Sequence, residues 1–158
     1  MDGRYVAGLF GYNLMVLEKN TAGITHEMSL RTPPAGGNCI NWIVGHILFY
    51  RNAVHAMLGL PPAWPGARQE QYGTGATLTG DAEPFGQLLA MYQRSQERVV
   101  PAIAALDAAG LARRMEAMGP LGPGSLGDRL VFFGFHEAYH FGQIGILRHA
   151  VGLTGAIG

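Results

Sequence analysis

The sequence predicts an all-α protein, a four-helix bundle with a long crossover between helices 2 and 3. Apolar residues recur at helical spacing between clusters of glycine and proline, and no segment alternates long enough to indicate a strand. The 158 residues are 48% hydrophobic, which is enough for one domain with a substantial core. We therefore expect residues 1–158 to form a single four-helix-bundle domain.

The first two helices are separated by a loop rich in proline and glycine, residues 32–37. The first helix is expected over residues 4–19. The second is expected over residues 38–58, because Asn38 is suited to cap its N-terminus and Gly59, followed by two prolines, stops it.

The crossover is predicted over residues 61–80, which are rich in Pro, Gly and Thr. A connection of this length is typical where two parallel or distant helices are joined across one end of a bundle. The third helix is then expected to open at Asp81 or Glu83, to bend or restart at Pro101, and to end near Leu106.

The last helix follows a second glycine- and proline-rich loop, residues 119–124. Ser125 and Asp128 have the spacing of a capping box, and the apolar pattern continues to about Val151. Gly134, Ala138 and Gly145 line up within about 40° on this helix, so another backbone could approach closely there. The approach is either within the bundle or between the subunits of a homodimer.

Charge and composition exclude several classes of function. Lys+Arg and Asp+Glu both number 11, and no basic run would follow a phosphate backbone, so nucleic acid is not an expected partner. The longest apolar stretch, residues 130–157, carries too many polar groups for a membrane span. Residues 1–5 do not resemble a secretory signal, so we expect a cytoplasmic protein. The single cysteine, Cys39, leaves His, Asp and Glu as the plausible metal ligands.

His136 and His140 are the strongest candidates for metal ligands. They lie four residues apart, so they share one face of the last helix with mostly apolar residues and point toward the core. Two imidazoles one turn apart could satisfy their ring nitrogens by binding one ion. They could equally be two hydrogen-bonded core histidines, so a third ligand has to decide.

The segment from His136 to His140 also matches the His-Glu-x-x-His fingerprint of zinc proteases, in which Glu137 would be the general base. Such proteases take their third ligand from downstream. The only histidine after His140 is His149, which is rotated by about 180° from it on the same helix. The protease interpretation is therefore disfavoured.

A third ligand from upstream is best supplied by His46, which shares its face of the second helix with an almost wholly apolar stripe. His55 lies about 180° round from His46 and is expected in solvent with its polar neighbours. His26 follows the first helix in a polar stretch and is also expected in solvent. Cys39 lies two turns, about 10 Å, from His46 and is expected to pack in the core.

These motifs resemble the DinB-like metal-binding bundles, a family that includes bacillithiol transferases and relatives of mycothiol-dependent maleylpyruvate isomerase. The resemblance is carried by residues 41–47 (Asn-Trp-Ile-Val-Gly-His-Ile), residues 136–144 (His-Glu-Ala-Tyr-His-Phe-Gly-Gln-Ile) and Arg148. It implies an up-and-down-like bundle, an open metal face, frequently a homodimer, and no single reaction. The metal ligands that it implies are His46, His136 and His140.

Three neutral nitrogen ligands leave a divalent ion with open positions for water or a substrate atom. Zinc, nickel or iron would suit imidazole ligands, and the ion would acidify a bound water or a low-molecular-weight thiol. Gln143, on the same face as His136, is expected to hydrogen-bond a ligand from outside, unless it only packs. Glu137 is the candidate catalytic base, although a partly exposed helix residue is the simpler interpretation.

Two functional hypotheses remain open at this stage. One is a metal-dependent transferase or hydrolase acting on a small-molecule substrate, with or without a low-molecular-weight thiol. The other is a non-catalytic metal-binding bundle with a sensing or structural role. An open coordination position beside a pocket would favour the enzyme, and a fourth protein ligand would favour the structural role.

Overall fold

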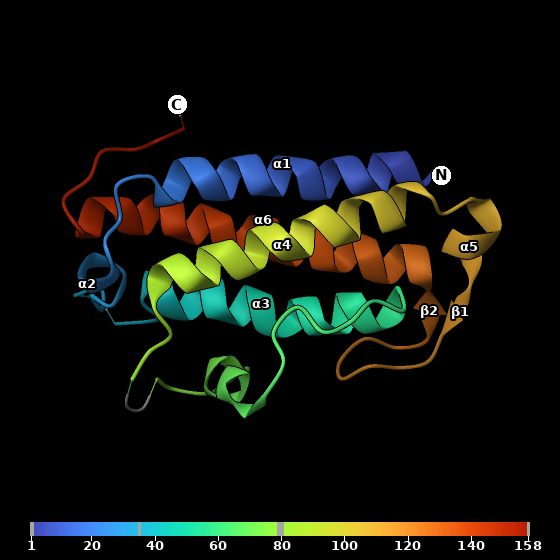
Figure 1. Ribbon diagram of the computed structural model, residues 1–158, viewed down its shortest axis with the longest axis horizontal. Coiled ribbons are helices and arrows are strands. Elements are labelled where there is room, and N and C mark those ends of the chain that lie inside the picture. Colours follow the sequence, from blue (N-terminus) through green and yellow to red (C-terminus); the bar gives the residue numbers. More distant parts are fainter. Residues whose placement is uncertain (1, 35, 79–80, 158) are drawn as a thin grey trace.

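The computed structural model describes residues 2–34, 36–78 and 81–157 and confirms the all-α fold class. Four long helices lie side by side (Figure 1). Within the described residues, no helix is long and apolar enough to cross a membrane. The long helices are α1 (Gly3–Thr21), α3 (Ile40–Met57), α4 (Phe85–Ala104) and α6 (Leu126–Ala150).

Short elements occupy the two ends of the bundle and the crossover (Figure 1). They are α2 (His26–Ser29), the 3-10 helix η1 (Ala67–Tyr72), α5 (Ala108–Ala112) and the antiparallel strands β1 (Arg114–Met115) and β2 (Gly124–Ser125). No segment of the sequence indicated these two strands. Two residues per strand are too few for an alternating pattern to appear in the sequence.

Helices α3 and α4 run parallel, which explains the long crossover. Asn41, near the start of α3, donates to the Glu83 carbonyl just before α4, and His55, near the end of α3, contacts Ser95 further along α4. A chain that leaves the end of α3 must therefore return along the whole bundle before α4 can begin.

Helices α1 and α6 form the second parallel pair, and α6 runs antiparallel to α3. Asn13 and then Asn20 of α1 donate to the carbonyls of Gly134 and then Phe141 of α6. Along α3, by contrast, His46 and then Tyr50 meet successively earlier residues of α6. Helix α1 also packs on α4, so the four helices close into one ring.

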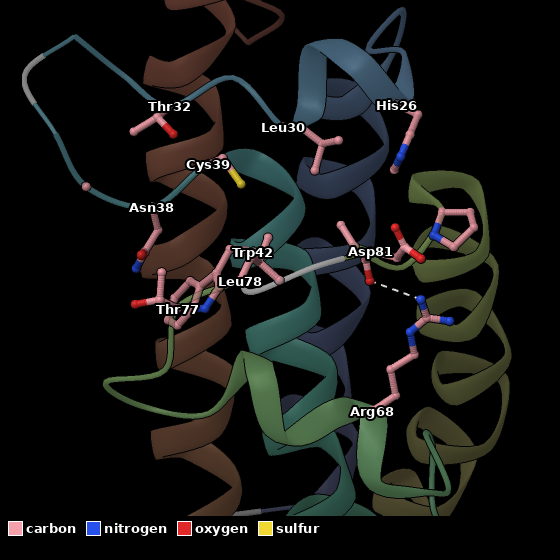
Figure 2. A pocket seen from close by; sticks show the side chains of 13 residues that line it. His26, Leu30, Thr32, Asn38, Cys39, Trp42, Arg68, Thr77, Leu78 and Asp81 are labelled. Carbon is pink, nitrogen blue, oxygen red and sulfur yellow. Dashed lines mark hydrogen bonds between the residues drawn. The ribbon is translucent and has the colours of Figure 1, made fainter.

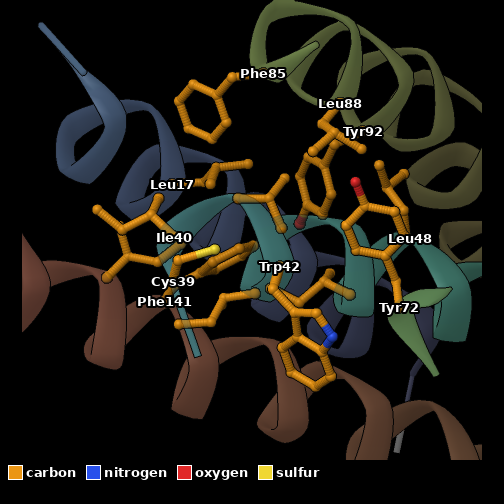
Figure 3. Close-up of a cluster of buried hydrophobic side chains, with 14 of the residues drawn as sticks. Leu17, Cys39, Ile40, Trp42, Leu48, Tyr72, Phe85, Leu88, Tyr92 and Phe141 are labelled. Atoms are coloured by element: carbon orange, nitrogen blue, oxygen red, sulfur yellow. The ribbon is translucent and has the colours of Figure 1, made fainter. Parts of the chain in front are cut away.

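The core consists of two apolar clusters, one toward each end of the bundle. The first includes Trp42, Leu88 and Phe141 (Figure 3), and the second includes Phe10 and Val99. Between them lies a buried set of polar side chains from all four long helices, which we call the polar layer. Its members are Asn13, Arg51, Tyr92, Ser95, Gln96 and Glu137.

Helix boundaries agree with the sequence where capping chemistry is strong. Ser125 and Asp128 form the predicted capping box at the start of α6. Helix α3 begins later than predicted, with Cys39 instead of Asn38 as its N-cap. Helix α4 continues through Pro101 to Ala104 without the predicted restart.

The small-residue face of α6 packs within the bundle. A methyl group on Gly134 would lie 2.5 Å from Leu9 Cδ2, and one on Gly145 would lie 3.2 Å from Asn20 Nδ2. Both neighbours belong to α1. These glycines are therefore explained by the α1–α6 contact, and they no longer support a homodimer.

Candidate metal site

The structure brings together the three histidines that the sequence singled out. His46 comes from α3, and His136 and His140 come from α6. One nitrogen of each ring lies within 4.8 Å of the others, and the Nε2 atoms of His136 and His140 are 3.2 Å apart. Among the described residues, no cysteine or carboxylate joins this group.

His46 is held by the crossover and by its own helix. Its Nδ1 lies 2.8 Å from the Tyr72 carbonyl oxygen and donates its proton there, which leaves Nε2 with a free lone pair. The indole of Trp42, one turn earlier, stacks on the imidazole with ring centroids 4.5 Å apart and planes 16° apart. Only 4% of His46 is exposed, so the surrounding side chains hold its ring in one orientation.

Gly45 allows the crossover to reach His46. An alanine methyl group at this position would lie 2.1 Å from Tyr72 Cδ1, which is inside any contact distance. The glycine therefore admits the Tyr72 ring against α3 and so brings the Tyr72 carbonyl to the imidazole. Sequence reasoning missed this role, although the glycine directly precedes the ligand candidate.

Gln143 contacts His140 from outside the histidine group. Gln143 Oε1 accepts a hydrogen bond from His140 Nδ1 at 2.8 Å. The proton on Nδ1 leaves a lone pair on His140 Nε2, which faces His136 Nε2. Two lone pairs cannot face each other at that distance, so a proton or a cation has to lie between the rings.

Burial favours the neutral form of the three histidines of this site. Burial, together with the neighbouring rings of His140 and His46, lowers the pKa of His136 from 6.5 to about 4. Burial likewise lowers the pKa of His46 and that of His140, despite the hydrogen bonds that they make. Neutral imidazole is the form that binds a divalent ion, so protons do not compete strongly at this site.

The residues present fit a divalent metal ion. Tetrahedral Zn²⁺ with Zn–N bonds of about 2.0–2.1 Å needs ligand nitrogens about 3.4 Å apart. The Nε2 atoms of His136 and His140 are 3.2 Å apart, and a nitrogen of His46 lies within 4.8 Å of a nitrogen on each of the other two rings. His136 Nδ1 is buried and has no hydrogen-bond partner among the described residues, whereas its Nε2 lies 3.2 Å from His140 Nε2. The set could supply three nitrogen ligands, one each from His46, His136 and His140.

Glu137 does not belong to this group, and the expectation that it is partly exposed was wrong. It is 3% exposed and turned into the polar layer. Its Oε2 accepts from Arg51 Nη2 at 2.9 Å, from the Tyr92 hydroxyl at 3.0 Å and from Asn13 Nδ2 at 3.2 Å, while its Oε1 accepts from Arg51 Nε. Its carboxylate is therefore fully engaged by buried donors.

The predicted surface position of His55 was also wrong. His55 and its neighbour Arg51 are both fully buried, and His55 contacts Ser95 Oγ at 2.8 Å. The crossover meets His55 at the Pro61 carbonyl and α4 meets it at Ser95, so this side of α3 is covered. His26 is partly buried and accepts from the Phe85 amide, whereas His149 is exposed.

A cavity of about 650 Å³ lies between α2, the start of α3 and the crossover (Figure 2), and the three candidate ligands are not part of its lining. Trp42 lines this cavity and also stacks on His46, so it is the side chain that the two regions share. Its lining mixes apolar and polar groups, among them Cys39, Arg68 and Asp81. Burial raises the pKa of the Cys39 thiol, and Cys39 packs in the core as predicted.

Comparison with known proteins gives a family and a structural neighbour. The model of the DinB superfamily matches residues 12–144. The structure of YfiT from Bacillus subtilis, described as a probable metal-dependent hydrolase with an unusual four-helix bundle topology, aligns with a TM-score of 0.72 and 16% sequence identity. The alignment covers 96% of this chain and 89% of YfiT. No curated protein matches the sequence.

Proposed function

The chain belongs to the DinB superfamily, and from that premise we propose that it is a divalent-metal-dependent enzyme that hydrolyses or transfers a group on a small substrate. The observation that carries the proposal is the convergence of three neutral imidazoles without a fourth protein ligand among the described residues. A site closed by protein would have a structural role, whereas three ligands leave positions for a substrate.

The proposed ligands are the Nε2 atoms of His46, His136 and His140. Tyr72 and Gln143 hold the protons of His46 and His140 on Nδ1, so both rings present lone pairs without having to change tautomer. When bound, the ion would act as a Lewis acid and lower the pKa of a water or thiol in an open coordination position. Zinc, nickel and iron all suit this donor set.

The substrate is proposed to be small because the cavity beside Trp42 holds about 650 Å³, within the usual range for small-molecule sites. Tyr50 closes the opposite side of His46. Its ring lies 5.0 Å from the His46 ring, and its hydroxyl is 2.8 Å from Thr74 Oγ1 in the crossover. These aromatic walls would exclude water from part of the site.

Thiol transfer is the second candidate reaction, and the position of Glu137 favours it. A hydrolase of the His-Glu-x-x-His type needs this carboxylate as a base, but here Arg51 and Tyr92 hold it inside the bundle. A thiol can ionise near neutral pH on a divalent ion without such a base. We therefore assign Glu137 to the bundle interior and not to proton transfer.

The test is a panel of reactions on metal-loaded protein. Ester and amide hydrolysis would be assayed beside transfer of bacillithiol, mycothiol or glutathione to simple electrophiles. Activity is expected to stop on chelation and to return with Zn²⁺, Ni²⁺ or Fe²⁺, and to be absent from His46→Ala/His140→Ala. His149→Ala is the matched control, because His149 is exposed and outside the site.

Each outcome of the panel bears on the proposal. Hydrolysis without added thiol supports the hydrolase, and a rate that depends on thiol supports the transferase. Turnover that survives both chelation and loss of the histidines contradicts the proposal. A metal-loaded protein that is inactive across the panel, with protein atoms in every coordination position, would instead support a sensing or structural role.

A further inference from the structure

The polar layer lies where the two helices that carry the histidines meet. Arg51 follows His46 by five residues on α3, and Glu137 directly follows His136 on α6. We propose that the Arg51–Glu137 ion pair positions α3 against α6 in the one register at which His46 meets the other two histidines. This inference rests on the proposed metal site and names the residues that hold its geometry.

The pair makes a two-point contact. Arg51 donates through Nε to Glu137 Oε1 and through Nη2 to Oε2 at 2.9 Å. A planar guanidinium facing a planar carboxylate in this way fixes distance and direction together. Arg51 is fully buried and Glu137 is 3% exposed, so water does not screen the interaction.

The other two long helices hold the pair in place. From α4, Gln96 Oε1 accepts from Arg51 Nη2 at 2.8 Å, and the Tyr92 hydroxyl bridges the two partners, accepting from Arg51 at 2.7 Å and donating to Glu137 at 3.0 Å. From α1, Asn13 donates both to Glu137 and to the Gly134 carbonyl. Each member of the pair is thus tied to a helix that carries no metal ligand.

Magnitudes show why a directional contact is needed. A slip of one residue between helices is about 1.5 Å, and it would break both bonds of the ion pair. Metal–ligand distances tolerate deviations of only about 0.2 Å. Apolar packing between α3 and α6 is non-directional and fixes an axial position less sharply than that.

Stability alone does not explain the pair. Buried ion pairs can often be replaced by apolar side chains of similar volume without loss of stability, and fixing a register is their best-attested use. The helices joined here are the two that must keep His46 in reach of His136 and His140. Positioning therefore accounts for the place of the pair as well as for its presence.

The decisive variant is Arg51→Met/Glu137→Gln, which removes both charges and leaves an amide for Tyr92 and Asn13. Its dissociation constant for Zn²⁺ would be measured by competition with a chelating dye, and its Co²⁺ form by visible absorption. We expect binding to weaken by about 10–100-fold, the usual effect of losing a group that orients ligands, and the Co²⁺ ligand-field bands to change. Parental affinity with an unchanged Co²⁺ spectrum would overturn the proposal.

The control is Ile103→Ala, which opens a cavity in α4 away from the histidines and lowers stability without touching the pair. It should keep the parental Zn²⁺ affinity and Co²⁺ spectrum. Equal weakening in the control would mean that general destabilisation, and not positioning, explains the loss. If the double variant fails to fold, Arg51→Lys replaces it in the test. It should lose less Zn²⁺ affinity than expected for the double variant, because lysine keeps the charge but cannot make the two-point contact.

A metal-free measurement separates this inference from the proposed function. Failure of the parent protein to bind Zn²⁺ or Co²⁺ would contradict the proposed metal site. The imidazole ¹⁵N resonances of metal-free protein would still report the arrangement of the three histidines. Their chemical shifts should change in Arg51→Met/Glu137→Gln and keep the parental values in Ile103→Ala. Equal chemical shifts in the parent and both variants would overturn the positioning role.

Discussion

The two sides of the α3–α6 contact carry polar groups of opposite kinds. On one side, three imidazoles converge, and His136 Nδ1 has no hydrogen-bond partner among the described residues. On the other, Arg51 and Glu137 are buried with their partners in place. His136 and Glu137 are adjacent in the chain, yet they belong to different sides. One turn of helix thus carries both a proposed metal ligand and a member of the buried ion pair.

Glu137→Ala tests this difference with the largest expected effect. It leaves the Arg51 charge buried without a partner, so the free energy of unfolding should fall by about 3–5 kcal/mol. Urea denaturation of metal-free protein measures it. His136→Ala should cost much less, because it removes a ring with a buried, unpartnered nitrogen. Equal losses in the two variants would contradict the division into two sides.

Gly45→Ala should have the next largest effect. The new methyl group would push Tyr72 away from α3, which should cost about 1–3 kcal/mol and also weaken metal binding, because the Tyr72 carbonyl orients His46. Gly8→Ala is the matched control, since nothing lies within 4 Å of the added methyl group. It should stabilise the protein by up to about 1 kcal/mol and leave the metal alone. The prediction fails when both variants behave alike.

The histidine side should make the metal-free protein sensitive to acid. In the folded state the pKa of His136 is lowered from 6.5 to about 4, so the unfolded chain binds more protons between these values. Stability should therefore be constant above about pH 6.5 and should fall as the pH drops toward about 4. Melting temperatures across this range measure it. His136→Leu should flatten the dependence, and an unchanged slope in that variant would assign the effect elsewhere.

The smallest effects are expected at the remaining histidines. His149 is exposed, so His149→Ala should change the free energy of unfolding by no more than about 0.5 kcal/mol. His55 is buried with Ser95 and Pro61 and not with the ligand group. Metal content should therefore stay at the parental level in both alanine variants, as measured by elemental analysis. Loss of the ion from either variant would contradict the proposed location of the metal site.

The sequence was sufficient to predict those features that leave a local or periodic pattern in it. Helical spacing gave the four long helices, the Ser125–Asp128 pair marked the start of α6, and the apolar face of α3 singled out His46. Gln143 was placed on the ligand side by the same argument, and it does contact His140. Each of these depends only on residues close together in the chain.

The parts that failed depend on residues far apart. A helical wheel assigns Arg51 and Glu137 to solvent because charges usually lie there, and only the meeting of four helices supplies the partners that permit their burial. His55 was misplaced because the crossover, which the wheel does not contain, covers its side of α3. The usable signal was Arg51 itself, a charge within an otherwise strongly apolar helix.

The central claim is that His46, His136 and His140 hold one divalent ion, and metal content per chain tests it most directly. Protein stripped with chelator, incubated with Zn²⁺ and desalted should retain about one ion per chain, and His46→Ala/His140→Ala treated in the same way should retain almost none. A parent protein that retains no ion, or a double variant that retains as much as the parent, would contradict the account.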